Sequence, residues 1–255
     1  MKLLKKIFNF ELLIQIRNLF GIRKIDISIT KLKEASSISD AFCWRTDNNF
    51  VTVFKYSDVL NNFYNIENSS VTFEFYDKSN KIIKRKIVKN LLDTNFLKID
   101  KKFLDGIEDY GVFYIFHKLE KKVDEKIIIS NRCYLGYSKN ENLASYVHGN
   151  TLARFETINK NKIGTDLIKN TFLSNQIYRV QTHFENYTKS EIFLTNPTSK
   201  KIVFKIKNNK YELISGNSII IDVTNIKHLE IYSNCLFFRP IIFNYKNNFL
   251  DVFHS

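Results

Sequence analysis

The pattern of apolar and polar residues changes its period near the start of the chain. Over residues 1–20, lysines recur on one side of a 3.6-residue period while leucine, isoleucine and phenylalanine fill the other side. This pattern predicts an amphipathic helix, and Gly21 is a residue suited to end it. From Ile25 to Thr30 the period becomes two, because isoleucines alternate with polar residues. Such alternation is typical of a half-buried β-strand.

Similar apolar runs continue along the chain, with turn residues about every 8 to 12 positions. In the first half, the predicted strands are Phe42–Thr46, Phe50–Lys55, Val71–Asp77, Ile82–Val88, Phe96–Ile99, Val112–His117, Lys126–Ser130, Arg132–Tyr137 and Ala144–His148. In the second half, they are Leu152–Ile158, Tyr178–Phe184, Glu191–Thr195, Lys201–Lys207, Tyr211–Ser215, Ser218–Val223 and His228–Ser233, before a closing pair. We expect helical turns in the polar stretches between Thr30 and Phe42 and between Ile158 and Ile177.

Two segments of the chain end in a similar way. The first begins Ser130-Asn131-Arg132-Cys133 and stops near His148, and the second begins Ser233-Asn234-Cys235 and stops at His254. Each has an aromatic-rich run, a Lys-Asn turn and a short return run. We interpret this likeness as an internal duplication that places His148 and His254 at equivalent positions.

The strand pattern and the repeat together predict an all-β fold of two tandem antiparallel β-sandwiches with immunoglobulin-like architecture. The expected units are an N-terminal basic amphipathic helix at 1–22, a first sandwich at 23–150 and a second at 151–255. The basic helix could lie on an anionic membrane surface or pack on the β-domain, and both interpretations stay open.

Composition argues against several other classes of protein. Of the 255 residues 44% are apolar, which is enough for one or two cores, and with 7 Gly and 2 Pro the turns must depend on Asn, Asp and Ser. The net charge of +13 comes mostly from lysines scattered through the turns, which argues against nucleic-acid binding. Three cysteines without paired spacing, no membrane-spanning run and no signal-peptide pattern indicate a cytoplasmic protein.

Candidate binding residues are polar side chains that share faces of aromatic strands. Period two places Arg132 with Tyr134 and His148 with Asn150, and it aligns Arg179, Gln181 and His183 in one polar stripe. Arg239 and His254 are the corresponding positions on the last hairpin. Directional polar groups beside aromatic rings suit a hydroxyl-rich ligand such as a carbohydrate.

No established catalytic or nucleotide-binding motif is present in the sequence. A metal site would need His148, His183 and His254 to converge from distant parts of the chain, so we expect neither metal nor cofactor. The cysteines resemble small core residues. The leading hypothesis is therefore a non-catalytic ligand-binding or assembly protein, with glycans as candidate ligands, near the cytoplasmic membrane surface. The alternatives are an enzyme with an interdomain polar site and non-specific nucleic-acid binding.

Overall fold

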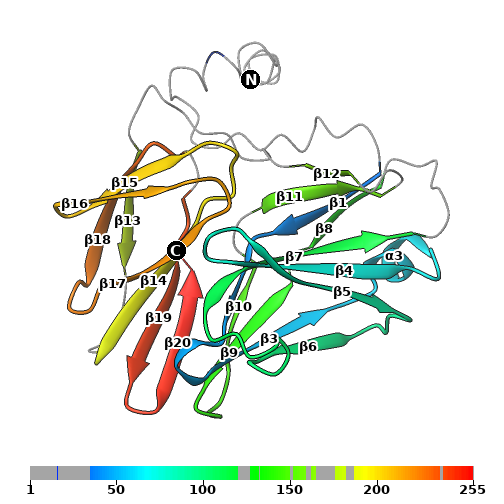
Figure 1. Cartoon of the computed structure of the whole chain (residues 1–255), viewed down its shortest axis with the longest axis horizontal. Coiled ribbons are helices and arrows are strands. Elements are labelled where there is room, and N and C mark those ends of the chain that lie inside the picture. The colour runs from blue at the N-terminus through cyan, green and yellow to red at the C-terminus, as the bar shows by residue number, and fades with distance from the viewer. Residues whose placement is uncertain are drawn as a thin grey trace, which may run out of the picture.

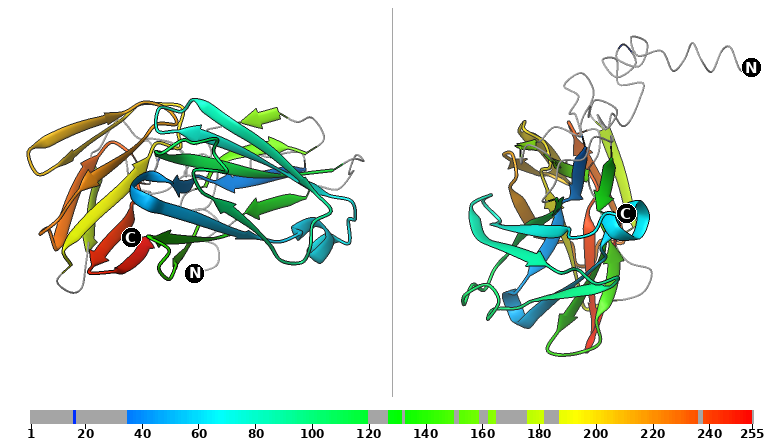
Figure 2. Two further views of the ribbon diagram at one scale, coloured as in Figure 1. Left: turned by 60° about the horizontal axis from the view of Figure 1, so that its bottom comes forward. Right: turned by 90° about the vertical axis from the view of Figure 1, so that its right-hand side faces the viewer.

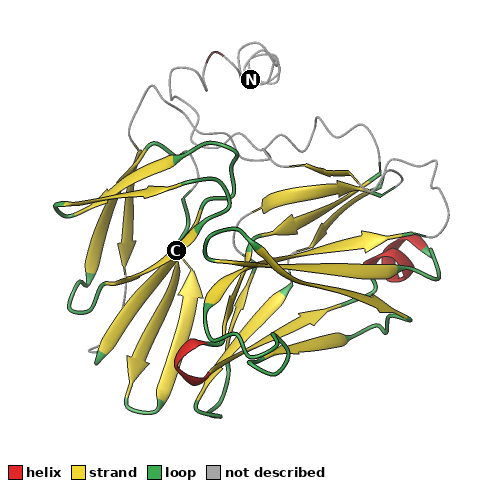
Figure 3. Ribbon diagram, in the orientation of Figure 1, coloured by secondary structure: helices red, strands yellow, loops and turns green. Residues whose placement is uncertain are grey.

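The computed structural model describes residues 16, 35–119, 127–131, 133–149, 152–158, 162–164, 176–181, 187–235 and 238–254. The expected all-β fold is confirmed, because these residues form five four-stranded sheets (Figure 1, Figure 3). Two short helical segments accompany them in this part of the chain, η2 (Asp47–Asn49) and α3 (Val59–Tyr64). The helix expected at 1–22 lies outside the described residues apart from Ile16. No described helix is long and apolar enough to cross a membrane.

The first half of the chain forms two facing sheets, here named C and D. Sheet C has the order β2 (Phe42–Arg45), β7 (Tyr110–Lys118), β4 (Ser70–Asp77), β5 (Ile82–Lys89). Sheet D has the order β10 (Ser145–His148), β9 (Tyr134–Lys139), β3 (Phe50–Tyr56), β6 (Asn95–Ile99). Alternate residues of each strand point into a core of aromatic rings, in which Phe54 contacts Phe73 and Phe113.

The second half forms sheets E and F, which lie beside the first half along the length of the molecule (Figure 1, Figure 2). Sheet E has the order β13 (Gln176–Gln181), β18 (His228–Ser233), β15 (Ile202–Ile206), β16 (Asn209–Leu213). Sheet F has the order β17 (Ser218–Asp222), β14 (Lys189–Thr195), β19 (Ile241–Lys246), β20 (Phe249–His254). A separate apolar core fills the space between these two sheets.

A fifth sheet, B, joins strands from both halves. Its order is β12 (Lys162–Gly164), β11 (Leu152–Thr157), β1 (Ser36–Asp40), β8 (Ile128–Asn131), and the β1–β8 pair is parallel whereas β1–β11 is antiparallel. Strand β11 of the second half thus pairs with β1 of the first half. The division into 23–150 and 151–255 remains a prediction.

The expectation of a helical turn between Thr30 and Phe42 is wrong for Ser36–Asp40, which is a fully buried strand. The hydroxyls of Ser37 and Ser39 are buried because they accept hydrogen bonds from backbone N–H groups of β7 that no described neighbouring strand accepts. The backbone N–H of Ile115 donates to Ser39 Oγ at 3.0 Å, and that of His117 donates to Ser37 Oγ at 3.0 Å. Polar residues in a strand therefore do not mark solvent exposure when they satisfy a neighbouring backbone.

The expectation that asparagine forms the turns is confirmed. Twelve non-glycine residues among those described have a positive φ, and nine of them are Asn. In the predicted hairpin between β4 and β5, Asn80 has a φ of 62°, and the N–H of Asp77 donates to Lys81 O at 2.9 Å. Asn adopts this left-handed conformation more readily than other residues with a side chain.

The two halves meet at an apolar seam formed by one face of sheet F and the end of the first sandwich. Phe193, Phe243 and Tyr245 of sheet F belong to the core of the first half. The ring of Phe243 lies 4.9 Å from that of Tyr137 and 5.9 Å from that of Phe50, in edge-to-face geometry. One continuous core therefore crosses the seam.

A buried ion network lies within this apolar seam. The guanidinium of Arg45 donates to both oxygens of Asp47, at 3.0 and 2.7 Å, and its Nη1 donates to Glu191 Oε2 at 2.8 Å. The Tyr245 hydroxyl donates to the same Glu191 oxygen at 2.5 Å. The Arg45 guanidinium carbon also lies 4.1 Å from the centre of the Phe50 ring. Arg45 thus connects β2 of the first half to β14 and β19 of the second.

The ion network lowers the pKa of Glu191. Burial by itself raises the pKa of this carboxyl, but the charge of Arg45 and hydrogen bonds from Lys189 and Tyr245 outweigh burial and lower the pKa to about 2. The ionised form is therefore the stable one at neutral pH.

We predict that Arg45→Met lowers the free energy of unfolding by about 3–5 kcal/mol, because it removes the buried cation that Asp47 and Glu191 share. Chemical denaturation monitored by Trp44 fluorescence measures the change. Lys201→Met is the control, since Lys201 pairs with Glu212 at a site where both side chains are about half exposed; it should change stability little. Equal losses in the two variants would contradict a structural role for the buried network.

Glu191 should also make the fold sensitive to acid. Its folded pKa lies below the ordinary value of 4.5, so its stabilising contribution is complete above pH 4.5 and disappears as pH falls through about 2. Glu191→Gln should show a shallower loss of stability over this window than the wild type. Thermal unfolding at successive pH values tests this, and parallel curves for the two proteins would refute it.

Candidate functional site

The outer face of sheet D presents a row of side chains that belong to four neighbouring strands. Strand pairing places Phe96 opposite Lys55, Lys55 opposite Tyr134, and Tyr134 opposite His148. Because side chains that pair across a sheet share one face, all four point away from the core. Phe96 is 71% exposed and Tyr134 is 60% exposed, which is unusual for rings of this size.

A second row on the same face adds a third ring. Tyr146 pairs with Gly136 across β10 and β9, and it is 46% exposed. A Cβ at Gly136 would lie 2.6 Å from Cε1 of Tyr146, so glycine is what allows the ring to lie flat on the sheet. The Lys55 ammonium lies 4.8 Å from the centre of the Tyr146 ring. We name Phe96, Tyr134 and Tyr146 the aromatic platform.

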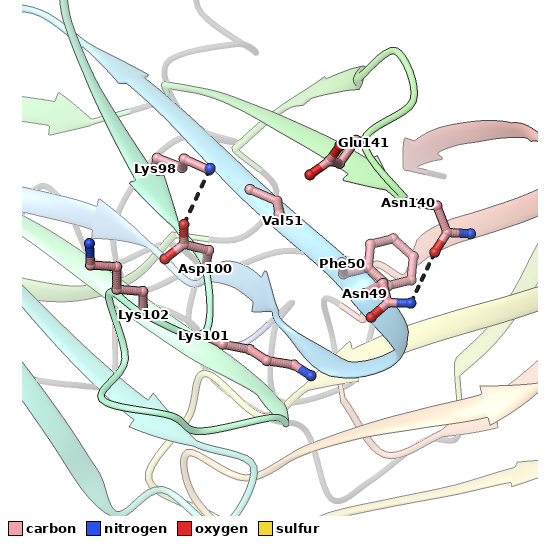
Figure 4. Close-up of a pocket in the computed structure, with 9 residues that line it drawn as sticks. All are labelled: Asn49, Phe50, Val51, Lys98, Asp100, Lys101, Lys102, Asn140 and Glu141. Carbon is pink, nitrogen blue, oxygen red and sulfur yellow. Dashed lines mark hydrogen bonds and ion pairs between the residues drawn. The ribbon is translucent and has the colours of Figure 1, made fainter.

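A pocket of about 520 Å³ lies on this face, at the end of β3 opposite to Lys55 (Figure 4). Figure 4 shows Val51 between the Asn49–Asn140 amide pair on one side and Lys98 with Asp100 on the other. The pocket is lined by Asn49, Phe50, Val51, Lys98, Asp100, Lys101, Lys102, Asn140 and Glu141. It therefore combines amides, carboxylates and ammonium groups beside the platform.

Hydrogen bonds fix several of these polar groups. Asn49 Nδ2 donates to Asn140 Oδ1 at 3.1 Å, and Lys98 Nζ lies 3.3 Å from Asp100 Oδ2. The backbone N–H of Phe103 donates to Asp100 at 2.8 Å, and this bond, followed by Lys98, lowers the pKa of Asp100. The Asp100 carboxylate is therefore ionised and able to accept hydrogen bonds from a ligand.

At the other edge of the same sheet, His148 of β10 meets His254 of β20. Their ring centres are 4.1 Å apart, and the two Nε2 atoms are 2.8 Å apart. A guanidinium N–H of Arg239 contacts the His254 ring, whose Nε2 lies 3.0 Å from Nη2. His148 Nδ1 lies 2.9 Å from Gly149 O. We name His148, His254 and Arg239 the histidine cluster.

The contact between the two histidines and that of Arg239 with His254 Nδ1 fit one arrangement of protons. His148 Nδ1–H donates to Gly149 O, so its Nε2 is an acceptor. His254 Nε2–H then donates to His148, and His254 Nδ1 accepts from Arg239. Burial, the charge of Arg239 and His148 together lower the pKa of His254 to about 4. His254 is therefore neutral at physiological pH, as this series of hydrogen bonds requires.

The cluster is poorly suited to metal binding. Among the residues that the structure describes, no group of three or more His, Cys, Asp or Glu side chains is placed to hold a metal ion. The Arg239 guanidinium beside His254 would also repel a cation. The third histidine considered for such a site, His183, lies outside the described residues.

The cysteines occupy apolar surroundings. Cys43 and Cys235 are buried, as expected for small core residues. Burial raises the pKa of Cys43, and burial followed by the charge of Asp40 raises the pKa of Cys133 to about 12. Neither thiol has the lowered pKa that a nucleophile at neutral pH requires.

Of the residues nominated from the sequence, four come together. His148 and His254 lie on the adjoining edge strands of sheets D and F, Tyr134 pairs with His148, and Arg239 contacts His254. Arg179 is on sheet E, where its exposed side chain forms an ion pair with Glu230. Three further candidates, Arg132, Asn150 and His183, lie outside the described residues, and so does the side chain of Gln181.

Sequence reasoning missed Phe96, Lys55 and the pocket. Phe96 and Lys98 alternate with Leu97 and Ile99 inside a strand that was predicted correctly, so period two already places them on the face opposite the core. That these positions adjoin Tyr134 depends on the pairing of β3 with both β6 and β9.

We predict that His254 makes the fold less stable in mild acid. Its ordinary pKa of 6.5 is lowered to about 4 in the folded state, so the unfolded chain takes up a proton first as pH falls from 6.5 to 4. Stability should therefore fall over this window, and less steeply in His254→Gln. Urea unfolding between pH 4 and 7 measures the slope. His228→Gln, at an exposed position on β18, should keep the wild-type slope; a wild-type slope in His254→Gln would contradict the prediction.

Comparison with known proteins gives no family for this chain. No family model matches it, and no curated protein or solved structure matches it. The site is therefore interpreted from its own residues.

Proposed function

We propose that this chain is a non-catalytic glycan-binding protein and that its ligand lies along the outer face of sheet D. The observation that carries the proposal is the aromatic platform, three exposed rings on three strands of one sheet face beside a polar pocket. An exposed cluster of this kind on a folded protein is typical of a binding surface. The apolar faces of sugar rings stack on aromatic side chains, while sugar hydroxyls require directional polar partners.

The dimensions of the platform favour an extended ligand. Phe96 and Tyr134 lie on either side of β3, and because neighbouring strands are about 4.8 Å apart, their attachment points are roughly 10 Å apart. Tyr146 lies one strand further on. An oligosaccharide running across the strands could contact all three rings and reach the histidine cluster, whose imidazoles offer further hydrogen-bonding groups.

The carboxylates of the pocket favour a glycan over a nucleic acid. Aromatic rings interleaved with lysines also suit single-stranded nucleic acid. However, Asp100 and Glu141 place two carboxylates in the same pocket, and Lys98 is already paired with Asp100. Carboxylates accept hydrogen bonds from hydroxyls and repel phosphates. Nucleic-acid binding is therefore the second candidate.

The enzyme alternative has less support. It requires a polar interdomain site built on His148, His183 and His254. Two of these imidazoles meet, but His254 is engaged by Arg239, and neither Cys43 nor Cys133 has the lowered pKa of an activated nucleophile. The geometry supports a role for the histidine cluster in ligand contact.

An internal duplication into two immunoglobulin-like sandwiches would explain the arrangement of the site. With β8 set aside, the strands of the first half from β2 to β10 can be aligned in chain order with β13 to β20. Sheet C then corresponds strand for strand to sheet E, and sheet D to sheet F. In this alignment β10 corresponds to β20, so His148 and His254 end equivalent strands. This correspondence supports the duplication inferred from the two endings.

The cellular setting belongs to the same proposal. The basic amphipathic pattern of residues 1–22 would hold the protein at the anionic cytoplasmic face of a membrane. The support for this part comes from the sequence.

We predict that Tyr134→Ala and Tyr146→Ala each weaken glycan binding by about 10-fold, because each removes a ring of the aromatic platform. A glycan array with the wild-type chain identifies the ligand, and calorimetry then measures its affinity for the variants. Tyr232→Ala is the matched control, since Tyr232 is 40% exposed on β18 of sheet E, away from the platform.

The control should bind like the wild type. Failure of the wild-type chain to retain any glycan would reject the proposal, as would equal losses in the platform variants and the control. Tight binding of a single-stranded oligonucleotide, with the same dependence on Tyr134, would favour the second candidate instead.

A further inference from the structure

A second cavity lies at the seam between the two halves, across the loop that follows β9 from the pocket in Figure 4. It has a volume of about 250 Å³. Its walls come from both halves, and Asn142 Nδ2 donates across the seam to Asn248 O at 2.9 Å. The cavity is lined by Lys139, Asn140, Asn142, Thr188, Lys189, Tyr245, Asn247, Asn248, Phe249 and Leu250.

Two ammonium groups converge on one ring at this cavity. Lys139 Nζ lies 4.7 Å from the centre of the Tyr245 ring, and Lys189 Nζ lies 5.6 Å from it. The hydroxyl of the same ring is part of the buried Arg45 network. Cations close to each other are unfavourable unless negative charge lies near them.

The described carboxylates do not balance these cations. The network and cavity hold three cations, Arg45, Lys139 and Lys189, and two carboxylates, Asp47 and Glu191, which leaves a net charge of 3 − 2 = +1. Lys189 is paired with Glu191 Oε1 at 2.6 Å. Lys139 lies near the rings of Phe50 and Tyr245 and has no ion pair with a described carboxylate. The surplus charge is therefore located at Lys139.

Neutral hydrogen-bond donors line the same cavity as this charge. Asn140 Oδ1 already accepts from Asn49, so the amide N–H groups of Asn140 are its free polar atoms. The side chains of Asn247 and Asn248 also line the cavity. A cation beside several amide donors in a cavity of this size is the arrangement that binds an oxyanion.

We propose that the seam cavity is a binding site for a small oxyanion group, a carboxylate, sulfate or phosphate, with Lys139 as its main charged partner. An anion bound here would touch both halves of the chain. Binding to the folded state alone would stabilise the fold, because the ligand shifts the equilibrium away from the unfolded chain. The proposal does not depend on the aromatic platform, which contributes no residue to this cavity, although Asn140 also lines the pocket beside that platform.

The test is thermal unfolding and calorimetry with sodium sulfate, sodium phosphate and sodium glucuronate at constant ionic strength, adjusted with sodium chloride. For the wild-type chain we expect a saturable rise in melting temperature with at least one of the three anions. Lys139→Gln should lower the affinity for that anion about 10-fold or more, because it removes a charge-assisted hydrogen bond. Lys139→Arg should retain binding.

Lys205→Gln is the matched control, because it removes the same charge from an exposed position on sheet E. It should bind like the wild type, and so should Tyr134→Ala, which separates this site from the platform. Glucuronate binding without phosphate binding would identify an acidic sugar as the source of the oxyanion, and binding of all three would identify a general oxyanion site. No saturable response to any anion, or equal responses of Lys139→Gln and Lys205→Gln, would overturn the proposal.

Discussion

The buried guanidinium of Arg45 constrains how the two halves of this chain pack. It lies among the rings of Phe50 and Phe243, where an unpaired charge would be strongly unfavourable. Asp47 supplies one partner from the same half, but Glu191 and Tyr245 come from the other. Only an arrangement that brings sheet F against the end of the first sandwich supplies the guanidinium with Glu191 and Tyr245. That arrangement also sets edge strand β10 beside β20.

Three features depend on this packing. The histidine cluster forms because β10 and β20 adjoin, with Val252 N donating to Ser145 Oγ at 2.9 Å. The seam cavity forms because the turn after β19 meets the loop after β9. The aromatic platform stays exposed because sheet F packs against the core of the first half and not over the outer face of sheet D. Binding surface and structural seam thus use different faces of neighbouring sheets.

The local pattern of residues was sufficient for most strands. Alternation identified β3 and β6 and the inward and outward positions within them, and asparagines marked the turns. It failed at β1, because Ser37 and Ser39 are buried as partners for backbone N–H groups of β7. A serine hydroxyl reads as polar in any local pattern, and only the neighbouring strand shows that it is satisfied.

By itself the sequence determined which residues face away from a core, since a period of two is a local property of the backbone. It therefore placed Tyr134 with Arg132, and His148 with Asn150, on common faces. Which strands become neighbours was decided by the tertiary structure. His148 and His254 are 106 residues apart, and Arg45 and Glu191 are 146 apart. Such pairs form only when the whole chain folds so that apolar surface is buried and buried charges are paired at the same time. The local period of apolar residues does not contain that information.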